Sequence, residues 1–165
     1  MKNITVKKIL ELTNGELITG NENLECENFS KDTRQIKEKD TYIGIKGEKF
    51  DGSAFWKDAL EKGAKCVIVE NIDFSKENLE KFKDKIIIKV ESTFDTLYKI
   101  ATYKREINNI PVVAITGSVG KTSTKDMIAS VVSQKYKTLK TIGNNNNNIG
   151  LPFTILRLKD EEVMI

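Results

Sequence analysis

The sequence has no histidine and only two cysteines among its 165 residues. The lack of histidine excludes histidine acid–base chemistry and histidine metal sites within this stretch. Cys26 and Cys66 lie far apart and form neither a metal-binding nor a redox motif, and two thiols are too few for a disulfide framework. We expect both to be reduced, partly buried thiols of a cytoplasmic protein.

Long apolar runs and a strong net charge are also missing. No segment approaches the ~20 apolar residues that a membrane helix needs, and residues 1–12 lack the apolar stretch of a signal peptide. The 27 basic and 24 acidic side chains are interspersed and leave a net charge of +3. We therefore expect neither nucleic acid nor a membrane as a partner. Hydrophobic residues at 39% and charged residues at 31% are typical of a soluble globular protein.

Apolar periodicity predicts short strands and helices in the first two thirds of the chain. Gly15 and Gly63 are natural helix stops, Ser53 is a candidate N-cap, and Ser92 with Asp95 resembles a capping box. The expected helices cover residues 6–13, 54–62, 75–82 and 93–104, and the expected strands cover residues 16–19, 24–29, 41–45, 65–70 and 86–90.

Asn108–Pro111 interrupts this pattern, so we place a domain boundary between residues 108 and 109. Beyond it we expect a short buried strand at Val112–Ile115, a helix over residues 121–135 with Met127, Ile128, Val131 and Val132 on one side, strands at 137–141 and 162–165, and a helix at 149–158 with Pro152 in its first turn.

Strands that alternate with helices indicate parallel βαβ units. The expected fold is α/β: a small mixed α/β N-terminal domain, residues 1–108, followed by the start of a P-loop α/β domain with a parallel sheet, residues 109–165. Because two or three parallel strands make a poor finished domain, we expect the chain to be a fragment of a longer protein.

The segment Thr116–Ser123, with the sequence TGSVGKTS, lies between the expected strand and helix, as in a phosphate-binding loop. Its glycines allow the backbone to curl around an anion, and the following helix presents its positive end. The predicted ATP-binding residues are Thr116, Gly117, Ser118, Val119, Gly120, Lys121, Thr122 and Ser123, with Lys121 and Thr122 as catalytic groups and Thr122 as a ligand of Mg²⁺.

This loop is a shortened variant, because the usual pattern has glycine where Ile115 stands. A glycine turn that happens to precede Lys121 and Thr122 is the plainer interpretation. A phosphate loop alone also serves kinases, GTPases, transporters and ligases alike. The guanine motif Asn-Lys-x-Asp is missing, which argues against a GTPase, and the shortened loop argues against a typical kinase.

An asparagine run, Asn144–Asn148, follows the expected strand at 137–141. By composition it is a flexible low-complexity loop. By position it lies at the carboxyl end of a parallel strand, where ligands of open α/β sheets bind.

Two polar turns, Lys31–Arg34 and Gly47–Gly52, are likewise open to a structural and a ligand-binding interpretation. Both are ordinary surface turns by composition, yet Arg34 is able to clamp a pyrophosphate and backbone amides are able to contact a base edge.

Together, these motifs resemble the Mur ligases from about Phe29 to Ile165. The first domain of that family shows Asp-Ser-Arg, then Gly-Glu-(Arg/Lys)-Phe-Asp-Gly, then Gly-Ala. The matching segments here are Asp32–Arg34, Gly47–Gly52 and Gly63-Ala64, with Thr33 in place of the serine. The segment Gly143–Pro152 is similar to the pattern Gly-Asn-x-Asn-Asn-x-Ile-Gly-x-Pro of the branch that adds D-alanyl-D-alanine, whereas sister ligases tend to carry threonines there.

The resemblance implies an ATP-dependent amide-bond ligase of cytoplasmic peptidoglycan precursor synthesis, with an acyl-phosphate intermediate. It implies UDP-N-acetylmuramoyl-tripeptide and D-Ala-D-Ala as substrates, with ATP and Mg²⁺. The implied substrate-binding residues are Thr33, Arg34, Gly47, Phe50, Asp51, Asn144, Asn146 and Asn147. We expect no turnover from this stretch alone. The alternatives are a sister ligase that adds a single amino acid and a non-catalytic module that binds nucleotide or uridine.

Overall fold

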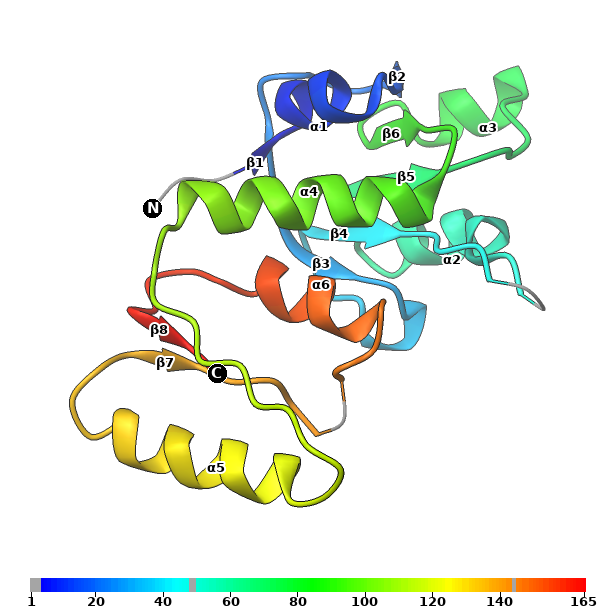
Figure 1. Ribbon diagram of the computed structural model, residues 1–165. Coiled ribbons are helices and arrows are strands. Elements are labelled where there is room, and N and C mark those ends of the chain that lie inside the picture. Colours follow the sequence, from blue (N-terminus) through cyan, green and yellow to red (C-terminus); the bar gives the residue numbers. More distant parts are fainter. Residues whose placement is uncertain (1–3, 48–49, 144) are drawn as a thin grey trace. The chain divides into compact units, whose positions relative to one another are not determined.

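The computed structural model describes residues 4–47, 50–143 and 145–165. The described chain divides after Ile100 into two compact units, which we call the first unit (residues 4–100) and the second unit (residues 101–165). Helix α4 (Thr93–Ile107) begins in the first unit and ends in the second (Figure 1). Within the described ranges, no helix is long and apolar enough to cross a membrane.

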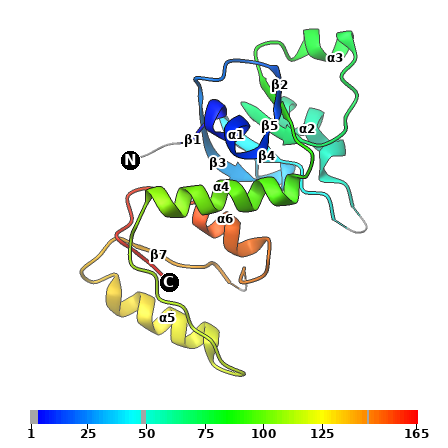
Figure 2. The same cartoon turned by 45° about the horizontal axis from the view of Figure 1, so that its top comes forward.

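The first unit is built on a mixed sheet of six strands in the order β1-β3-β4-β5-β6-β2. Its strands are β1 (Ile4–Thr5), β2 (Glu16–Thr19), β3 (Glu25–Ser30), β4 (Asp40–Ile43), β5 (Cys66–Val69) and β6 (Ile86–Lys89). The four central strands β3 to β6 run parallel, and β1 and β2 pair antiparallel at the two edges. Figure 2 shows β3, β4 and β5 side by side.

Most helices of the first unit lie between strands in the sequence, in agreement with the predicted alternation, and α4 follows the last strand, β6. They are α1 (Val6–Thr13), the short 3-10 helices η1 (Thr33–Gln35) and η2 (Gly52–Phe55), α2 (Trp56–Glu61), α3 (Lys76–Lys81) and the first half of α4. The predicted capping box at the start of α4 is present in one direction, because Ser92 Oγ accepts the Asp95 N–H at 3.1 Å.

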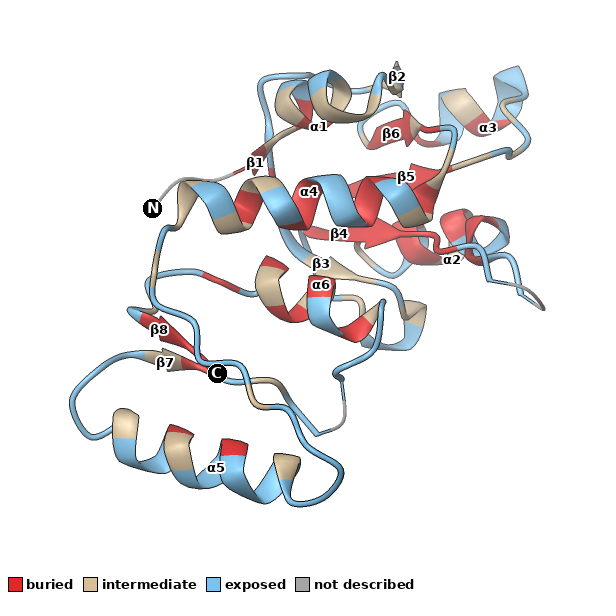
Figure 3. Cartoon of the chain, viewed as in Figure 1, coloured by how far each residue is buried: buried red, intermediate tan, exposed pale blue. Residues whose placement is uncertain are grey.

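The core of this unit follows from strands that are apolar on both faces. On one face, Tyr42, Val67 and Ile87 are in register and pack against α2 and α3, where Trp56 and Phe82 meet edge to face with ring centroids 5.4 Å apart. The residues of the other face that follow them in register, Ile43, Ile68 and Ile88, are fully buried as well. This continuous burial appears as the red strands of Figure 3.

Ser53 is not the N-cap that the sequence predicts. The turn of η2 precedes α2, and Asp51 caps η2 by accepting the Ser53 N–H at 2.9 Å. Ser53 is instead fully buried, and its hydroxyl donates to Gly44 O at 3.2 Å and accepts the Glu70 N–H at 3.1 Å. A short buried hydroxyl thus joins the ends of β4 and β5, which local spacing does not reveal.

The second unit contains α5 (Lys121–Val132), β7 (Thr138–Leu139), α6 (Gly150–Leu156) and β8 (Val163–Met164). Strands β7 and β8 pair in parallel, and Val112 forms a single parallel bridge to Met164. Two small cores result, one of Ala129, Val163 and Ile165 under α5, and one of Leu139, Leu158 and Met164.

Two expectations for the second unit were wrong. Val112–Ile115 is neither a regular strand nor buried, because only Val112 bridges a neighbouring strand and both Val112 and Val113 are exposed. In α5, Ile128 and Val132 pack on the core together with Ala129, but Met127 and Val131 are 70% and 72% exposed. Figure 3 shows the outer side of α5 in pale blue. Apolar content alone did not say which side of the helix faces the strands.

Candidate functional site

The loop between Ile115 and α5 is exposed and shaped by its glycines. Gly117 has φ of 150° and Gly120 has φ of 78°, in the range that other L-residues adopt only with strain. Gly120 is the N-cap of α5 and no side chain caps the helix. The first turn of a 12-residue helix therefore offers its N–H groups and its positive dipole end on the side of the loop.

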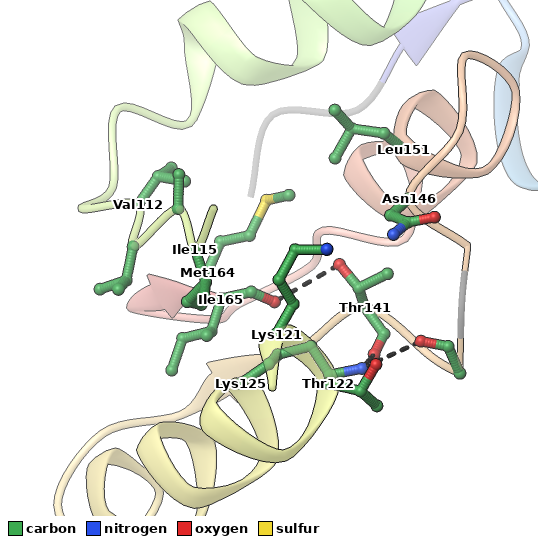
Figure 4. Close-up of a pocket in the computed structure, with 13 residues that line it drawn as sticks. Val112, Ile115, Lys121, Thr122, Lys125, Thr141, Asn146, Leu151, Met164 and Ile165 are labelled. Carbon is green, nitrogen blue, oxygen red and sulfur yellow. Dashed lines mark hydrogen bonds between the residues drawn. The ribbon is translucent and has the colours of Figure 1, made fainter. Parts of the chain in front are cut away.

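Lys121 and Thr122, the first two residues of α5, line a pocket of about 260 Å³. The Lys121 ammonium donates to Gly117 O, so that its charge lies over the glycine loop. Figure 4 shows the Lys121 side chain reaching into the pocket, with Asn146 and Leu151 on one side and Val112 and Met164 on the other. The other lining residues are Val113, Ala114, Ile115, Lys125, Thr141, Gly143 and Ile165. Apolar lining with a few polar groups, here two lysines and two threonines among them, is typical of a small-molecule site.

Lys125 lies in the same pocket, and sequence reasoning missed it. Its ammonium donates to Thr141 O at 2.8 Å and to Gly143 O at 3.0 Å, at the exit of β7 (Figure 4). The only signal in the sequence is its spacing of four residues from Lys121, which places both side chains on one side of the helix.

The predicted asparagine loop follows directly, and its members differ in what they do. Asn146 lines the pocket. Asn147 Oδ1 accepts the N–H groups of Gly150 at 2.7 Å and Ile149 at 3.2 Å, so this side chain orders the start of α6. Asn144 lies outside the described residues. The structure thus brings one asparagine, Asn146, beside Lys121 and Thr122, and gives a second, Asn147, a structural contact.

In the first unit, the turn after β3 holds Asp32, Thr33 and Arg34. Asp32 accepts the Arg34 backbone N–H at 3.0 Å, and the two side chains form a bidentate pair, Nε to Oδ1 at 2.9 Å and Nη2 to Oδ2 at 2.7 Å. The side-chain and backbone hydrogen bonds from Arg34 lower the pKa of Asp32 from 3.8 to about 2. Because the Arg34 side chain is 84% exposed, its guanidinium is oriented by Asp32 and open to solvent.

The turn after β4 holds the second predicted segment, Gly47–Gly52, of which Glu48 and Lys49 lie outside the described residues. Gly47 N–H donates to Phe50 O at 2.7 Å, and the backbones of Lys46 and Asp51 form an isolated antiparallel β-bridge. The exposed ring of Phe50 stacks on Phe55, with centroids 5.1 Å apart and planes 21° apart. This stack presents a flat apolar surface to solvent.

These two turns lie at the same edge of the first sheet, because β3 and β4 are parallel neighbours and each turn follows the carboxyl end of its strand. Tyr42 lies beneath them, and its hydroxyl donates to Gly52 O at 2.8 Å. Burial, reinforced by the nearby carboxylates of Asp32, Asp58 and Asp51, raises the pKa of Tyr42 to about 12. Acidic groups from both turns therefore surround one buried phenol.

The residues of the second unit fit a nucleotide phosphate with its metal ion. A glycine loop with positive φ, a helix start without a side-chain cap and a lysine over the loop are features that suit an anion. Among the described residues, histidine, cysteine, aspartate and glutamate form no group of three or more that would hold a metal by itself. Thr122 brings a hydroxyl oxygen to the pocket, and phosphate oxygens would supply further ligands to Mg²⁺.

This chain belongs to the Mur ligase family. The family model described as "Mur ligase family, catalytic domain" matches residues 27–115, and the model described as "Mur ligase middle domain" matches residues 115–165. The two matches meet at Ile115, directly before the glycine loop. The first unit therefore corresponds largely to the N-terminal domain of such a ligase and the second to the beginning of the middle domain.

Within the family, the chain resembles UDP-N-acetylmuramoyl-tripeptide–D-alanyl-D-alanine ligases. It is 36% identical over 162 residues to that of Buchnera aphidicola subsp. Baizongia pistaciae, covering 96% of this chain and 34% of the relative. It is 36% identical over 159 residues to that of Bacillus subtilis, covering 94% of this chain and 33% of the relative. The chain thus spans about a third of the length of the curated relatives that it matches.

Solved structures give the same result. A crystal structure of MurF from Acinetobacter baumannii matches with a TM-score of 0.82 and 29% identity, over 100% of this chain and 36% of that one. The MurF ligase of Thermotoga maritima, solved in complex with ADP, matches with a TM-score of 0.68 and 35% identity, over 84% of this chain and 31% of that one.

Proposed function

We propose that Thr116–Ser123 bind the phosphates of ATP for an amide-bond ligation. The pocket that joins Lys121, Thr122 and Asn146 at the start of α5 supports this most directly. Lys121 would neutralise charge on the β- and γ-phosphates, and Thr122 would orient Mg²⁺, which when bound withdraws charge from the transferring phosphoryl group. The backbone of Thr116–Gly120 would hold the phosphates in place.

The reaction that we propose for the whole protein is addition of D-Ala-D-Ala to UDP-N-acetylmuramoyl-tripeptide. ATP would phosphorylate the peptide carboxylate, and the amine of D-Ala-D-Ala would attack the acyl phosphate, with release of ADP and phosphate. The curated relatives with this name support the assignment. The setting would be cytoplasmic peptidoglycan precursor synthesis. Since this chain covers about a third of those relatives, we expect no turnover from it alone.

For the first domain, residues 1–108, we propose binding of the uridine end of the substrate, with residues 109–165 as the first part of a P-loop domain with a parallel sheet. Arg34 would contact the pyrophosphate, since its guanidinium is oriented and exposed. Thr33, Gly47, Phe50 and Asp51 would contact the base and sugar, with the Phe50–Phe55 stack as the flat apolar surface. Asn146, with Asn144 and Asn147, would contact the sugar or the peptide stem.

Two calorimetric titrations of this chain test these assignments separately. ADP with Mg²⁺ should bind the unaltered chain, and Lys121→Ala should weaken binding by about tenfold or more. Lys140→Ala is the matched control, because Lys140 pairs with Asp126 on the surface of the same unit and does not line the pocket. Equal affinity of the Lys121→Ala and Lys140→Ala proteins would contradict the phosphate-loop assignment.

The second titration uses UDP-N-acetylmuramoyl-tripeptide, with UMP as competitor. Binding that UMP displaces and that Thr33→Ala with Arg34→Ala abolishes would support the uridine site. A folded chain that binds ADP but not this substrate would favour a nucleotide-binding module over a ligase of this branch. If the chain binds UDP-N-acetylmuramoyl-dipeptide instead of UDP-N-acetylmuramoyl-tripeptide, a sister ligase that adds a single amino acid is favoured.

A further inference from the structure

Lys125 is a buried lysine, 9% exposed, that the proposed chemistry leaves unused. An ammonium taken out of water requires compensating contacts. An ion pair contributes little, because Asp126 Oδ1 lies 3.9 Å away and is itself 3.0 Å from Lys140 Nζ. The two close contacts are backbone carbonyls, Thr141 O at 2.8 Å and Gly143 O at 3.0 Å. A residue that only filled space under α5 would not need this charge.

Those two carbonyls flank the point where β7 ends and the asparagine loop begins. The Asn145 N–H donates to Ile142 O at 3.2 Å, between the two residues that Lys125 holds. On its other side the loop is packed on α6, because a Cβ on Gly150 would come within 2.7 Å of Asn145 Cα. Asn146 therefore lies between a segment fixed by Lys125 and a segment fixed by α6.

The same helix face reaches the glycine loop. Lys121, one turn before Lys125, donates to Gly117 O, and both lysines line the pocket with Asn146. Helix α5 is thus a rigid link: one lysine contacts the loop proposed to hold ATP, and the next holds the loop that carries Asn146. Any ligand that orders the start of α5 also acts on a helix that is bonded to Thr141 and Gly143, directly before the asparagine loop.

We propose that Lys125 is a positioning residue that fixes the asparagine loop beside the phosphate loop, so that nucleotide binding and the placement of Asn146 are coupled. The coupling rests on the proposed nucleotide site, whereas the positioning role is independent of it. Lys125 touches neither nucleotide nor substrate in this proposal. It acts through the carbonyls of Thr141 and Gly143.

Hydrogen exchange without any ligand tests the positioning role. Lys125→Met keeps the length of the side chain and removes its donors, so exchange of the Asn145 amide should rise about tenfold, which corresponds to ~1.4 kcal/mol. Exchange in the middle of α5, at Ala129, should change much less. Lys125→Arg keeps donors and should restore most of the protection, and Lys140→Met should have no effect. A uniform rise across the whole unit in Lys125→Met would show a purely structural role and overturn the proposal.

Exchange with ADP and Mg²⁺ tests the coupling. In the unaltered chain, ADP should slow exchange both at Gly120–Thr122 and at Asn145–Asn147. In Lys125→Met, ADP should still protect the glycine loop, and protection of the asparagine loop should be lost. Retained protection of Asn145–Asn147 in that variant would overturn the coupling. Failure of the unaltered chain to bind ADP would instead refute the proposed nucleotide site and, with it, the coupling. The ligand-free experiment would still decide whether Lys125 is a positioning residue.

Discussion

Asp32 and Arg34 form an ion pair in which the carboxylate holds the guanidinium in one orientation, ready to contact a ligand. Two hydrogen bonds fix the guanidinium while leaving its outer side in water. Since Asp32 is itself exposed to solvent, we expect the pair to orient Arg34 and to add little to the stability of the fold. Two hydrogen bonds from Asp32 restrict the rotamers of Arg34 more than one would. Less conformational entropy of Arg34 is then lost when an anion binds.

The pKa of Asp32 should therefore depend on Arg34. It lies at about 2, below the ordinary 3.8, so the carboxylate stays ionised and paired through pH 4 and loses its pairing as the pH falls through about 2. In Arg34→Met the Asp32 carboxyl should titrate close to 3.8. Carboxyl carbon shifts followed by NMR measure both midpoints. An unaltered protein whose Asp32 titrates near 3.8 would show that the two side chains do not pair in solution.

Tyr42→Phe should destabilise the first unit by about 1–2 kcal/mol, because Gly52 O would lose its donor in a buried position. The unaltered protein should also lose stability between about pH 10 and pH 12. The unfolded chain releases the phenol proton near 10 while the folded chain holds it to about 12, so unfolding becomes easier as the pH rises through that window. Denaturant unfolding at pH 7 and pH 11 measures both effects, and the Phe variant should show a smaller pH dependence.

Sequence reasoning found residues whose role is local and missed those whose partners are distant. The glycine loop with Lys121 was predicted because its pattern is contiguous. The buried hydroxyl of Ser53 joins Gly44 to Glu70, and Lys125 reaches Thr141 and Gly143. No periodicity in a single sequence reports such long-range contacts, and an isolated lysine on a helix is usually a solvated surface residue.

At the scale of elements, prediction succeeded where the strand pattern was strongest. The runs that became β5 and β6 are bounded by turn residues and buried on both faces, so length and composition sufficed. The run Val112–Ile115 has the same composition and formed only a single bridge. Whether such a run becomes a strand depends on neighbours that pair with it, and its own residues carry no information about them.

The start of α6 depends on a close approach that only glycine allows. Gly150→Ala should push the Asn145 backbone away, because a Cβ would lie 2.7–2.8 Å from it, and should destabilise the second unit by ~1–3 kcal/mol. Gly143→Asn is the matched control, since φ there is 53° with open space around it, and asparagine tolerates this conformation. Thermal unfolding compares the two. Equal stability of both variants would mean that the loop is not packed on α6 in solution.

The glycine loop allows strain to be separated from packing. A Cβ on Gly120 would have 4.0 Å of clearance to Thr124 Oγ1, so Gly120→Ala meets no obstacle and suffers only from φ of 78°. We expect the free energy of unfolding of the second unit to fall by about 1–2 kcal/mol. The binding free energy of ADP should fall by a similar amount, because the loop must keep this conformation to hold phosphate. Calorimetry and unfolding measure the two losses. Unchanged affinity would show that the phosphate does not require the left-handed backbone at Gly120.

At the scale of the whole chain, the two units differ in how much apolar surface they bury. The first unit has three central strands, β4, β5 and β6, whose residues are almost all buried, and helices α2 and α3 pack on them. The second has strands of two residues and leaves Val112, Met127 and Val131 exposed. Local stability follows buried apolar contact, so the unit that carries the proposed nucleotide site should be the less stable of the two.

Amide hydrogen exchange of the unaltered chain tests this difference directly. Amides of β5 and β6, at Val67–Val69 and Ile87–Ile88, should exchange at the rate of global unfolding of the first unit, because their hydrogen bonds lie inside a sheet with both faces covered. Amides of α5 and β7 should exchange faster by at least about a hundredfold, equivalent to ~3 kcal/mol. Added ADP should reduce this difference in exchange rate by stabilising the second unit, whereas UMP should leave the exchange rates of the α5 amides unchanged. Protection of α5 equal to that of β5 without ligand would mean that the two units unfold as one, and that the exposed apolar residues of α5 do not weaken it.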